Sequence, residues 1–233
     1  MSDIRSVQGS LKVRFKNPAL LEQALIHSSY LNEYPAEVPA SNERMEFLGD
    51  AVLGFIVAEK LYRSFPDMAE GEMTRVRSAL VRRETLAHVA GSLEIGSYLY
   101  VGKGEEASGG RQKPANLASA LEAVIAAVYL DRGLAVTRKL VLGWLAGEFQ
   151  AVMAKKKGFD CKSRLQELAQ SEYHSSPSYR TLQAAGPDHD KTFTVEVQIG
   201  GRVLGKGSGK SKKLAETEAA RNALERLGGG FTG

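Results

Sequence analysis

The 233-residue sequence contains only one cysteine, Cys161, one tryptophan and four histidines. A single cysteine excludes an intrachain disulfide, and four scattered histidines provide no recognisable spacing for a zinc cluster. We therefore expect any catalytic metal ion to be bound by oxygen atoms.

Long apolar runs are also missing. The longest, residues 51–58 and 123–130, are far shorter than the roughly 20 residues that a membrane-spanning helix needs. Residues 1–11 lack the apolar core of a signal peptide. These features predict a cytoplasmic protein with no membrane partner.

The net charge of +4 is unevenly distributed along the chain. Residues 1–154 carry 17 Lys and Arg against 18 Asp and Glu, whereas residues 155–233 carry 14 against 9. The second segment can therefore attract a polyanion. Three of its positive charges form the run 155–157, which a solvated linker would also contain, so charge alone does not identify a binding site.

Apolar residues at spacings of three and four predict that the first two-thirds of the chain is all-helical. A glycine-rich and serine-rich segment at 102–111 is expected to form a loop. The expected helices are 18–27, 42–64, 71–91, 115–131 and 136–154.

From residue 160 the pattern predicts a helix at 161–171, three short strands and a last helix at 211–227. In the second strand, the apolar residues 193, 195, 197 and 199 alternate with polar ones, which predicts one buried face and one solvent-facing face. Gly200-Gly201 predicts a hairpin turn into a strand at 202–205. The inner side of the last helix is expected to carry Leu214, Ala220, Leu224 and Leu227.

These elements predict two domains. The first, residues 1–154, is all-α. The second, residues 160–229, is a small α+β domain of the order α-β-β-β-α with both helices on one face of the sheet. A basic flexible linker is expected at 155–159.

The most informative stretch is the predicted helix that begins at residue 42. Glu43, Glu46 and Asp50 fall within about 60° of one another on a helical wheel, in a helix that is otherwise largely apolar. Buried carboxylates need partners, because a lone buried charge costs several kcal/mol. Either arginines or a divalent cation can satisfy them.

A second acidic position favours the cation. Glu122 lies in another nearly apolar helix, 117–130, where no charge is otherwise expected. Mg²⁺ binds a few carboxylates together with water and phosphate oxygens, which suits hydrolysis of a phosphodiester. A pair of helices could bring Glu46, Asp50 and Glu122 together.

Two segments resemble the ribonuclease III family. Residues 42–50, Asn-Glu-Arg-Met-Glu-Phe-Leu-Gly-Asp, are similar to its signature stretch, and residues 122–131, Glu-Ala-Val-Ile-Ala-Ala-Val-Tyr-Leu-Asp, are similar to its second acidic helix. The resemblance implies an endonuclease domain that uses Mg²⁺, for which Mn²⁺ can substitute.

The resemblance also implies roles for individual residues. Glu46, Asp50 and Glu122 would be Mg²⁺ ligands, and Glu43 and Glu70 would lie near the RNA backbone or support the site. These five are the candidate catalytic residues. Phe47 would pack across the two-fold interface of a homodimer.

One position departs from the family pattern. Ser119 occupies the place where the family usually has Asp or Asn, three residues before Glu122. A serine hydroxyl can reach a metal ion directly or through water but brings no charge, so we expect weaker Mg²⁺ binding without loss of activity. The competing interpretation is a catalytically degenerate relative, which the intact acidic positions disfavour.

Residues 205–211, Gly-Lys-Gly-Ser-Gly-Lys-Ser, are similar to a nucleotide-binding phosphate loop but are one residue too short. We therefore expect no nucleotide cofactor. Ser211 is instead a natural N-cap for the last helix, and Lys210, Lys212 and Lys213 gather at its N-terminus, where backbone N–H groups also attract anions. This arrangement predicts contact with nucleic-acid phosphate.

The order and spacing of four segments resemble the double-stranded-RNA-binding domain. They are 165–167 (Leu-Gln-Glu), 177–179 (Pro-Ser-Tyr), 186–189 (Gly-Pro-Asp-His) and 212–216 (Lys-Lys-Leu-Ala-Glu). Such domains recognise the shape of A-form RNA. The resemblance implies RNA contacts by Gln166, Glu167, His189, Lys210, Lys212 and Lys213.

Together these resemblances predict a homodimeric, Mg²⁺-dependent endonuclease that cuts both strands of double-stranded RNA. The products would carry 5′-phosphate and 3′-hydroxyl ends with short 3′ overhangs, and precursors of ribosomal and messenger RNA are the expected substrates. The alternative is a non-catalytic double-stranded-RNA-binding dimer that retains the nuclease fold.

Overall fold

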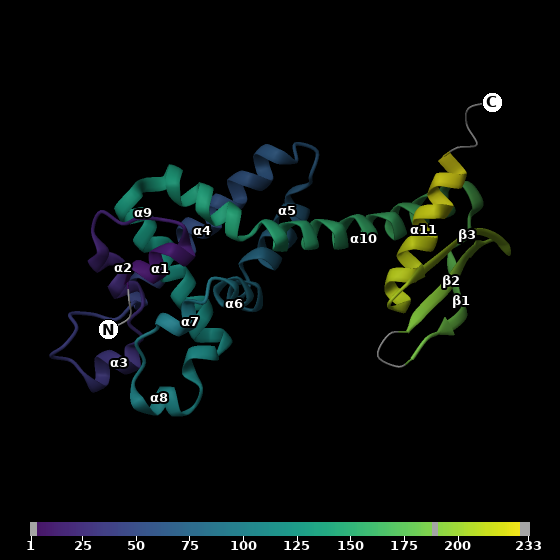
Figure 1. The fold of residues 1–233 in the computed structure, drawn as a ribbon. Helices are drawn as coiled ribbons and strands as arrows, with labels where there is room; N and C mark the ends of the chain where they lie inside the picture. Colours follow the sequence, from purple (N-terminus) through teal and green to yellow (C-terminus); the bar gives the residue numbers. More distant parts are fainter. Residues whose placement is uncertain (1–3, 188–190, 229–233) are drawn as a thin grey trace. The chain divides into compact units, whose positions relative to one another are not determined.

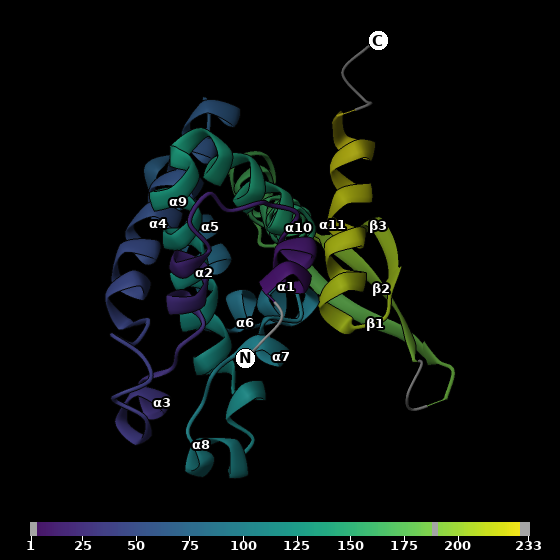
Figure 2. The same ribbon diagram turned by 60° about the vertical axis from the view of Figure 1, so that its left-hand side comes forward.

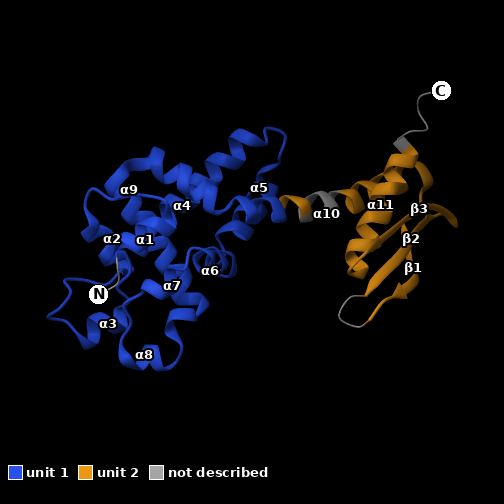
Figure 3. Ribbon diagram, in the orientation of Figure 1, with its two compact units in different colours: residues 1–152 blue, residues 153–233 orange. Residues whose placement is uncertain are grey.

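The structure is a computed structural model that describes residues 4–187 and 191–228, with the backbone alone for residues 155–160. The chain divides into two compact units, residues 1–152 and 153–233 (Figure 3). The predicted fold class is confirmed, because a helical unit precedes an α-β-β-β-α unit (Figure 1).

The helices of the first unit pack around two long central helices, α4 and α9, which lie side by side in both views (Figures 1 and 2). Together these two helices carry about half of the buried apolar side chains of this unit. The elements are α1 (Ile4–Leu11), α2 (Pro18–Ala24), α3 (Ser28–Glu33), α4 (Glu43–Ser64), α5 (Glu70–Val81), α6 (Arg83–Ser92), α7 (Ile95–Tyr98), α8 (Lys103–Ala107), the short 3-10 helix η1 (Gly110–Gln112) and α9 (Pro114–Trp144).

Several helix boundaries differ from the prediction, including the end of the predicted helix 18–27 and the predicted loop at 102–111, which contains α8 and η1. Two differences lie inside long helical stretches. The single helix expected at 71–91 is two helices, because the chain is extended at Arg82 and the Thr85 hydroxyl donates to the Ala79 carbonyl at 2.8 Å. The break expected near residue 133 is a local kink within α9, where Gly133 has φ 75°. Neither boundary carries a proline, the strongest sequence signal for a helix end.

The helix α10 (Ala146–Tyr173) runs through the segment predicted to be a flexible linker, 155–159. The structure therefore has helix where the lysine run and Gly158 suggested a break. The proposed domain limits themselves remain predictions.

The second unit contains β1 (Ser178–Ala185), β2 (Thr192–Ile199), β3 (Arg202–Gly209) and α11 (Lys212–Gly228). The strands form an antiparallel sheet in the order β1-β2-β3. The hairpin turn at Gly200-Gly201 is confirmed, with φ of 57° and 80° at the two glycines. The core joins α10, β2 and α11 through Leu165, Ala169, Val197, Ile199, Ala219, Ala220 and Ala223.

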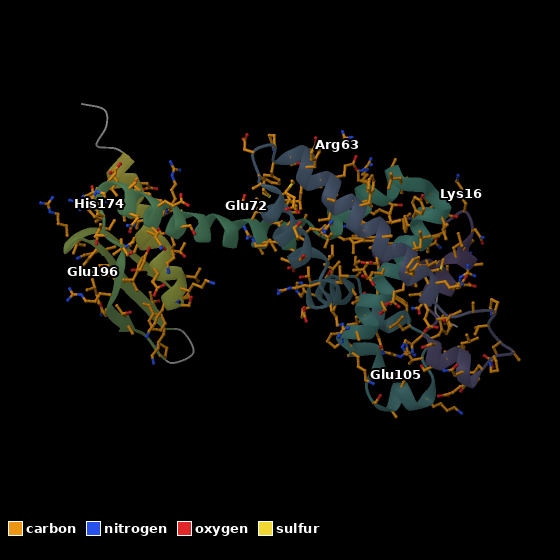
Figure 4. The ribbon with its side chains drawn as sticks, turned by 180° about the vertical axis from the view of Figure 1, so that it is seen from behind. Lys16, Arg63, Glu72, Glu105, His174 and Glu196 are labelled. Carbon is orange, nitrogen blue, oxygen red and sulfur yellow. The ribbon has the colours of Figure 1, made fainter. Side chains whose placement is uncertain are left out.

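Two predictions about burial in this unit were wrong. Leu214 is exposed, because glycines of β3 approach the backbone of α11 so closely that the helix presents alanines on its inner side. Glu196, which is labelled in Figure 4, was expected on the solvent face of β2 but is buried beneath Arg180 and Gln198. Hydrogen bonds from Gln198 and then from Arg180 lower the pKa of its carboxyl group.

Candidate active site and RNA-binding surface

The two acidic helices cross at a glycine. An ideal β-carbon added to Gly49 in α4 would lie 1.8 Å from the backbone carbonyl oxygen of Glu122 in α9. No side chain fits in that space, so glycine allows the two backbones to touch. The contact places Glu46 and Asp50, which flank Gly49 on α4, beside Glu122.

The electrostatics of Glu122 reflect this proximity. Partial burial, followed by the negative charges of Asp50 and Glu46, raises the pKa of Glu122 from 4.5 to about 7. Within the described residues, 4–187 and 191–228, none of the three carboxylates forms an ion pair with a basic side chain. Pairing with arginine, the alternative raised by the sequence, does not occur among the described residues.

Ser119 lies one turn before Glu122 on the same helix and joins this group. Its hydroxyl Oγ donates a hydrogen bond to Oε1 of Glu46 at 2.8 Å. The serine therefore links the two helices at the acidic group and adds a fourth oxygen donor. It also holds one of the carboxylates in place.

The donor set fits a hard cation. It consists only of oxygen atoms and includes three carboxylates with no basic partner in the described part. Within that part, no three Asp, Glu, His or Cys side chains are already arranged about one point as metal ligands. An all-oxygen set of this kind suits Mg²⁺, which completes its coordination shell with water and phosphate oxygens.

The other two predicted acidic residues, Glu43 and Glu70, are not among the charges that raise the pKa of Glu122. Glu43 is exposed and accepts a hydrogen bond from Ser41 Oγ at 2.7 Å. Glu70 begins α5 and lines a hollow with Tyr62, at the far end of α4. Asp50 and Tyr62 are separated by about 18 Å along the helix axis, from the rise of about 1.5 Å per residue. One chain alone does not bring Glu70 to Glu122.

Asp131, the last residue of the second acidic motif, has a structural role. Its two carboxylate oxygens accept hydrogen bonds from the backbone N–H groups of Lys16 and Asn17, each at 2.8 Å. It thereby anchors the segment that leads into α2, and it takes no part in the acidic group.

Phe47 projects from α4 and is 81% exposed. It borders a hollow that Leu20, Leu48 and Leu130 also line. A largely exposed phenylalanine beside a hollow lined by three leucines is an unusual surface for an isolated protein.

In the second unit, the predicted RNA contacts are exposed. Gln166 and Glu167 lie on the solvent side of α10, and Lys210, Lys212 and Lys213 surround the start of α11. The predicted N-cap is confirmed, because Ser211 Oγ accepts a hydrogen bond from the Leu214 N–H at 3.2 Å. His189 lies outside the described residues.

The sequence interpretation missed Gly49 as a site residue. Its signal was a glycine inside an otherwise strong helical pattern, which often marks a close backbone approach. The partner of that approach could not be read from the sequence.

The fold and site define a class of protein: a helical nuclease unit joined to a unit that binds double-stranded RNA. Residues 17–149 match the model of the family described as "Ribonuclease-III-like", and residues 161–227 match that of the "Double-stranded RNA binding motif". Within the described residues, no helix is both long and apolar enough to cross a membrane.

Curated relatives extend the likeness over the whole chain. "Ribonuclease 3" of Dehalococcoides mccartyi is 52% identical over 232 residues, covering 100% of this chain and 98% of the relative. "Ribonuclease 3" of Geobacter sulfurreducens is 48% identical, covering 95% and 89%. The nuclease domain of ribonuclease III from Campylobacter jejuni, described for flexibility in a region involved in dimer formation, has a TM-score of 0.59 and 37% identity, covering 64% of this chain and 99% of that domain.

This chain belongs to the ribonuclease III family. It is an endoribonuclease specific for double-stranded RNA. The alternative of a non-catalytic RNA-binding dimer is not retained.

Proposed function

We propose that Glu46, Asp50 and Glu122, with Ser119, bind Mg²⁺, for which Mn²⁺ can substitute, and that this group cleaves the RNA. The supporting observation is the raised pKa of Glu122 beside two other carboxylates that have no basic partner in the described part. Such a group is unfavourable without a cation, because like charges in a partly buried site repel one another. Perturbed titration of this kind is typical of functional sites.

Each of these side chains would have one role in hydrolysis of the phosphodiester. A bound Mg²⁺ would supply a hydroxide nucleophile and neutralise charge on the phosphate. Glu122 must lose its proton to act as a ligand, and Ser119 keeps the Glu46 carboxylate oriented by its hydrogen bond. Exposed Asp50 leaves this group open to substrate. Glu43 and Glu70 would support the RNA backbone contact from outside the group.

The direct test is incubation of a long RNA duplex with and without Mg²⁺, followed by analysis of the product ends. We expect cleavage only with Mg²⁺ or Mn²⁺, leaving 5′-phosphate and 3′-hydroxyl ends with a short 3′ overhang. Equal cleavage in a chelator would overturn the metal-dependent mechanism.

The substitution Ser119→Asp should lower the Mg²⁺ concentration for half-maximal cleavage by about tenfold, because a charged oxygen replaces a neutral one beside the cation. Without metal, the same change should lower the thermal midpoint, because it adds a fourth negative charge next to Glu46. Mg²⁺ titrations of cleavage and of thermal unfolding measure the two effects. Ser119→Ala is the control, and an unchanged Mg²⁺ requirement in Ser119→Asp would remove this residue from the site.

We propose that Gln166 and Glu167 contact ribose hydroxyls in one minor groove, that the loop with His189 enters the next, and that Lys210, Lys212 and Lys213 contact phosphate. Exposure of both helical sets on one small unit supports this arrangement, which is how such domains recognise A-form RNA.

Replacing both Lys212 and Lys213 with alanine should weaken binding of unrelated RNA duplexes to a similar degree. The slope of log affinity against log salt concentration should become shallower by about two, roughly one for each lost phosphate contact. Filter binding or fluorescence anisotropy at several salt concentrations measures both quantities. A loss confined to one RNA sequence would contradict a phosphate contact.

We propose that the protein is a homodimer formed around α4, through Phe47 and the two other exposed aromatic side chains of this helix, Phe55 and Tyr62. The likeness to a nuclease domain with a dimer-forming region supports this. Light scattering should give about twice the chain mass of 25.2 kDa. Processing of ribosomal and messenger RNA precursors in the cytoplasm completes the proposed function.

A further inference from the structure

An acidic residue lies within reach of the two lysines that begin α11. Glu216 follows Lys212 by four residues and Lys213 by three, the spacings at which opposite charges on a helix pair with each other. Such pairs would neutralise the lysines in the absence of RNA. Within the described residues, however, Glu216 forms no ion pair with either lysine.

The Glu216 carboxylate instead pairs with another helix. Its Oε2 lies 2.6 Å from Nζ of Lys162 on α10, and both side chains are only 30% exposed. Partial burial of both side chains reduces the screening of this pair by solvent and salt.

The ring of Tyr179 in β1 holds the lysine of this pair. Lys162 Nζ lies 4.5 Å from the ring centroid, within the range of a cation–π contact. Burial, and then the charge of Glu216, raise the pKa of Tyr179 to about 12. Because the phenol is neutral at physiological pH, Glu216 is the charged partner of Lys162.

We propose that Lys162 is a positioning residue for RNA binding, which holds Glu216 away from Lys212 and Lys213 so that both lysines remain available to RNA phosphate. This inference rests on the proposed function of those lysines. It makes the phosphate-binding end of α11 depend on a side chain from α10, the helix that carries the predicted minor-groove contacts.

The inference predicts opposite results for the two halves of the pair. Lys162→Met releases Glu216 to pair with a lysine, which removes about one phosphate contact. Duplex binding should weaken by about three- to tenfold, and the slope of log affinity against log salt should become shallower by about one. Glu216→Gln removes the competing charge, so its slope should stay at least as steep as that of the unmodified protein.

The decisive variant is the double substitution Lys162→Met with Glu216→Gln in the full-length chain. It should recover the original slope although Lys162 is still absent. Arg202→Met is the matched control, since it removes one exposed positive charge at the start of β3 and should leave the slope unchanged. Lys162→Arg, which keeps the pair, should also behave as the unmodified protein.

Anisotropy titrations with an RNA duplex between about 0.05 and about 0.2 M salt measure the slopes, and circular dichroism checks the fold of each variant. An unchanged slope in Lys162→Met, or equal weakening by Lys162→Met and Glu216→Gln, would overturn the inference and indicate a purely structural bridge. If Lys162→Met does not fold, the Glu216→Gln slope alone decides, because a shallower slope there contradicts the proposal. Absence of salt-dependent binding by the unmodified protein would instead contradict the proposed function.

Discussion

Glu122→Gln should reduce the rate of RNA duplex cleavage by about three orders of magnitude and leave the dissociation constant for duplex RNA within about twofold. Glutamine keeps the size of the side chain but cannot carry the negative charge that the cation requires. RNA binding depends mainly on the second unit, which this substitution does not touch. Single-turnover cleavage with Mg²⁺ and binding without it measure the two quantities separately.

The same variant distinguishes loss of a metal ligand from loss of structure. In the folded protein the pKa of Glu122 is about 7, compared with 4.5 ordinarily. Between these values the folded state binds more protons than the unfolded state, so the free energy of unfolding should fall as pH rises from about 4.5 to about 7. Glu122→Gln should lack this decrease in metal-free thermal unfolding. Identical pH profiles for both proteins, or unchanged cleavage, would remove Glu122 from the acidic group.

Gly49→Ala should have the largest effect on stability. The added β-carbon would lie 1.8 Å from the Glu122 carbonyl oxygen, which is backbone and cannot rotate away. The helices α4 and α9 would have to separate, at a cost of about 3 kcal/mol or more, as in overpacked cores. For a unit of this size that corresponds to a fall of roughly 10 °C in the thermal midpoint.

A matched glycine separates this effect from helix propensity. Gly143 lies in α9, the partner of α4 in this crossing, and an added β-carbon there would meet nothing within 4 Å. Gly143→Ala should therefore be neutral or slightly stabilising, because alanine favours helix by up to about 1 kcal/mol over glycine. Differential scanning calorimetry measures both variants, and similar midpoints for the two would contradict the close helix crossing. Gly49→Ala should also raise the Mg²⁺ requirement, because it moves Glu122 from Asp50.

Much of the architecture followed from local sequence patterns. The helical period predicted the first unit, and the alternation in β2 with Gly200-Gly201 predicted the hairpin. The break at Arg82 could not be predicted, since it depends on a hydrogen bond between Thr85 and Ala79 across two helices. Burial of Glu196 likewise depends on Arg180 from a neighbouring strand, and strand periodicity contains no information about cross-strand partners.

The candidate site was predictable in part. The helical wheel placed Glu46 and Asp50 on one face, and the family resemblance added Glu122. The sequence could not show that a glycine permits the helix crossing, that Ser119 binds Glu46, or that Glu70 lies at the far end of α4. The first two facts depend on contacts between segments about 70 residues apart, which local spacing does not encode.

The contact between β3 and α11 sets the distance between the sheet and this helix in the RNA-binding unit. A β-carbon on Gly205 would lie 2.3 Å from the Ala219 carbonyl oxygen, and one on Gly207 would lie 2.2 Å from the Ala219 nitrogen. Main-chain atoms therefore set this distance. A larger side chain at either glycine can only increase the distance, and no substitution can reduce it. Relatives that bind the same A-form geometry should therefore tolerate many changes on the outer side of α11. At the contact between β3 and α11, they should keep glycine or alanine on both elements.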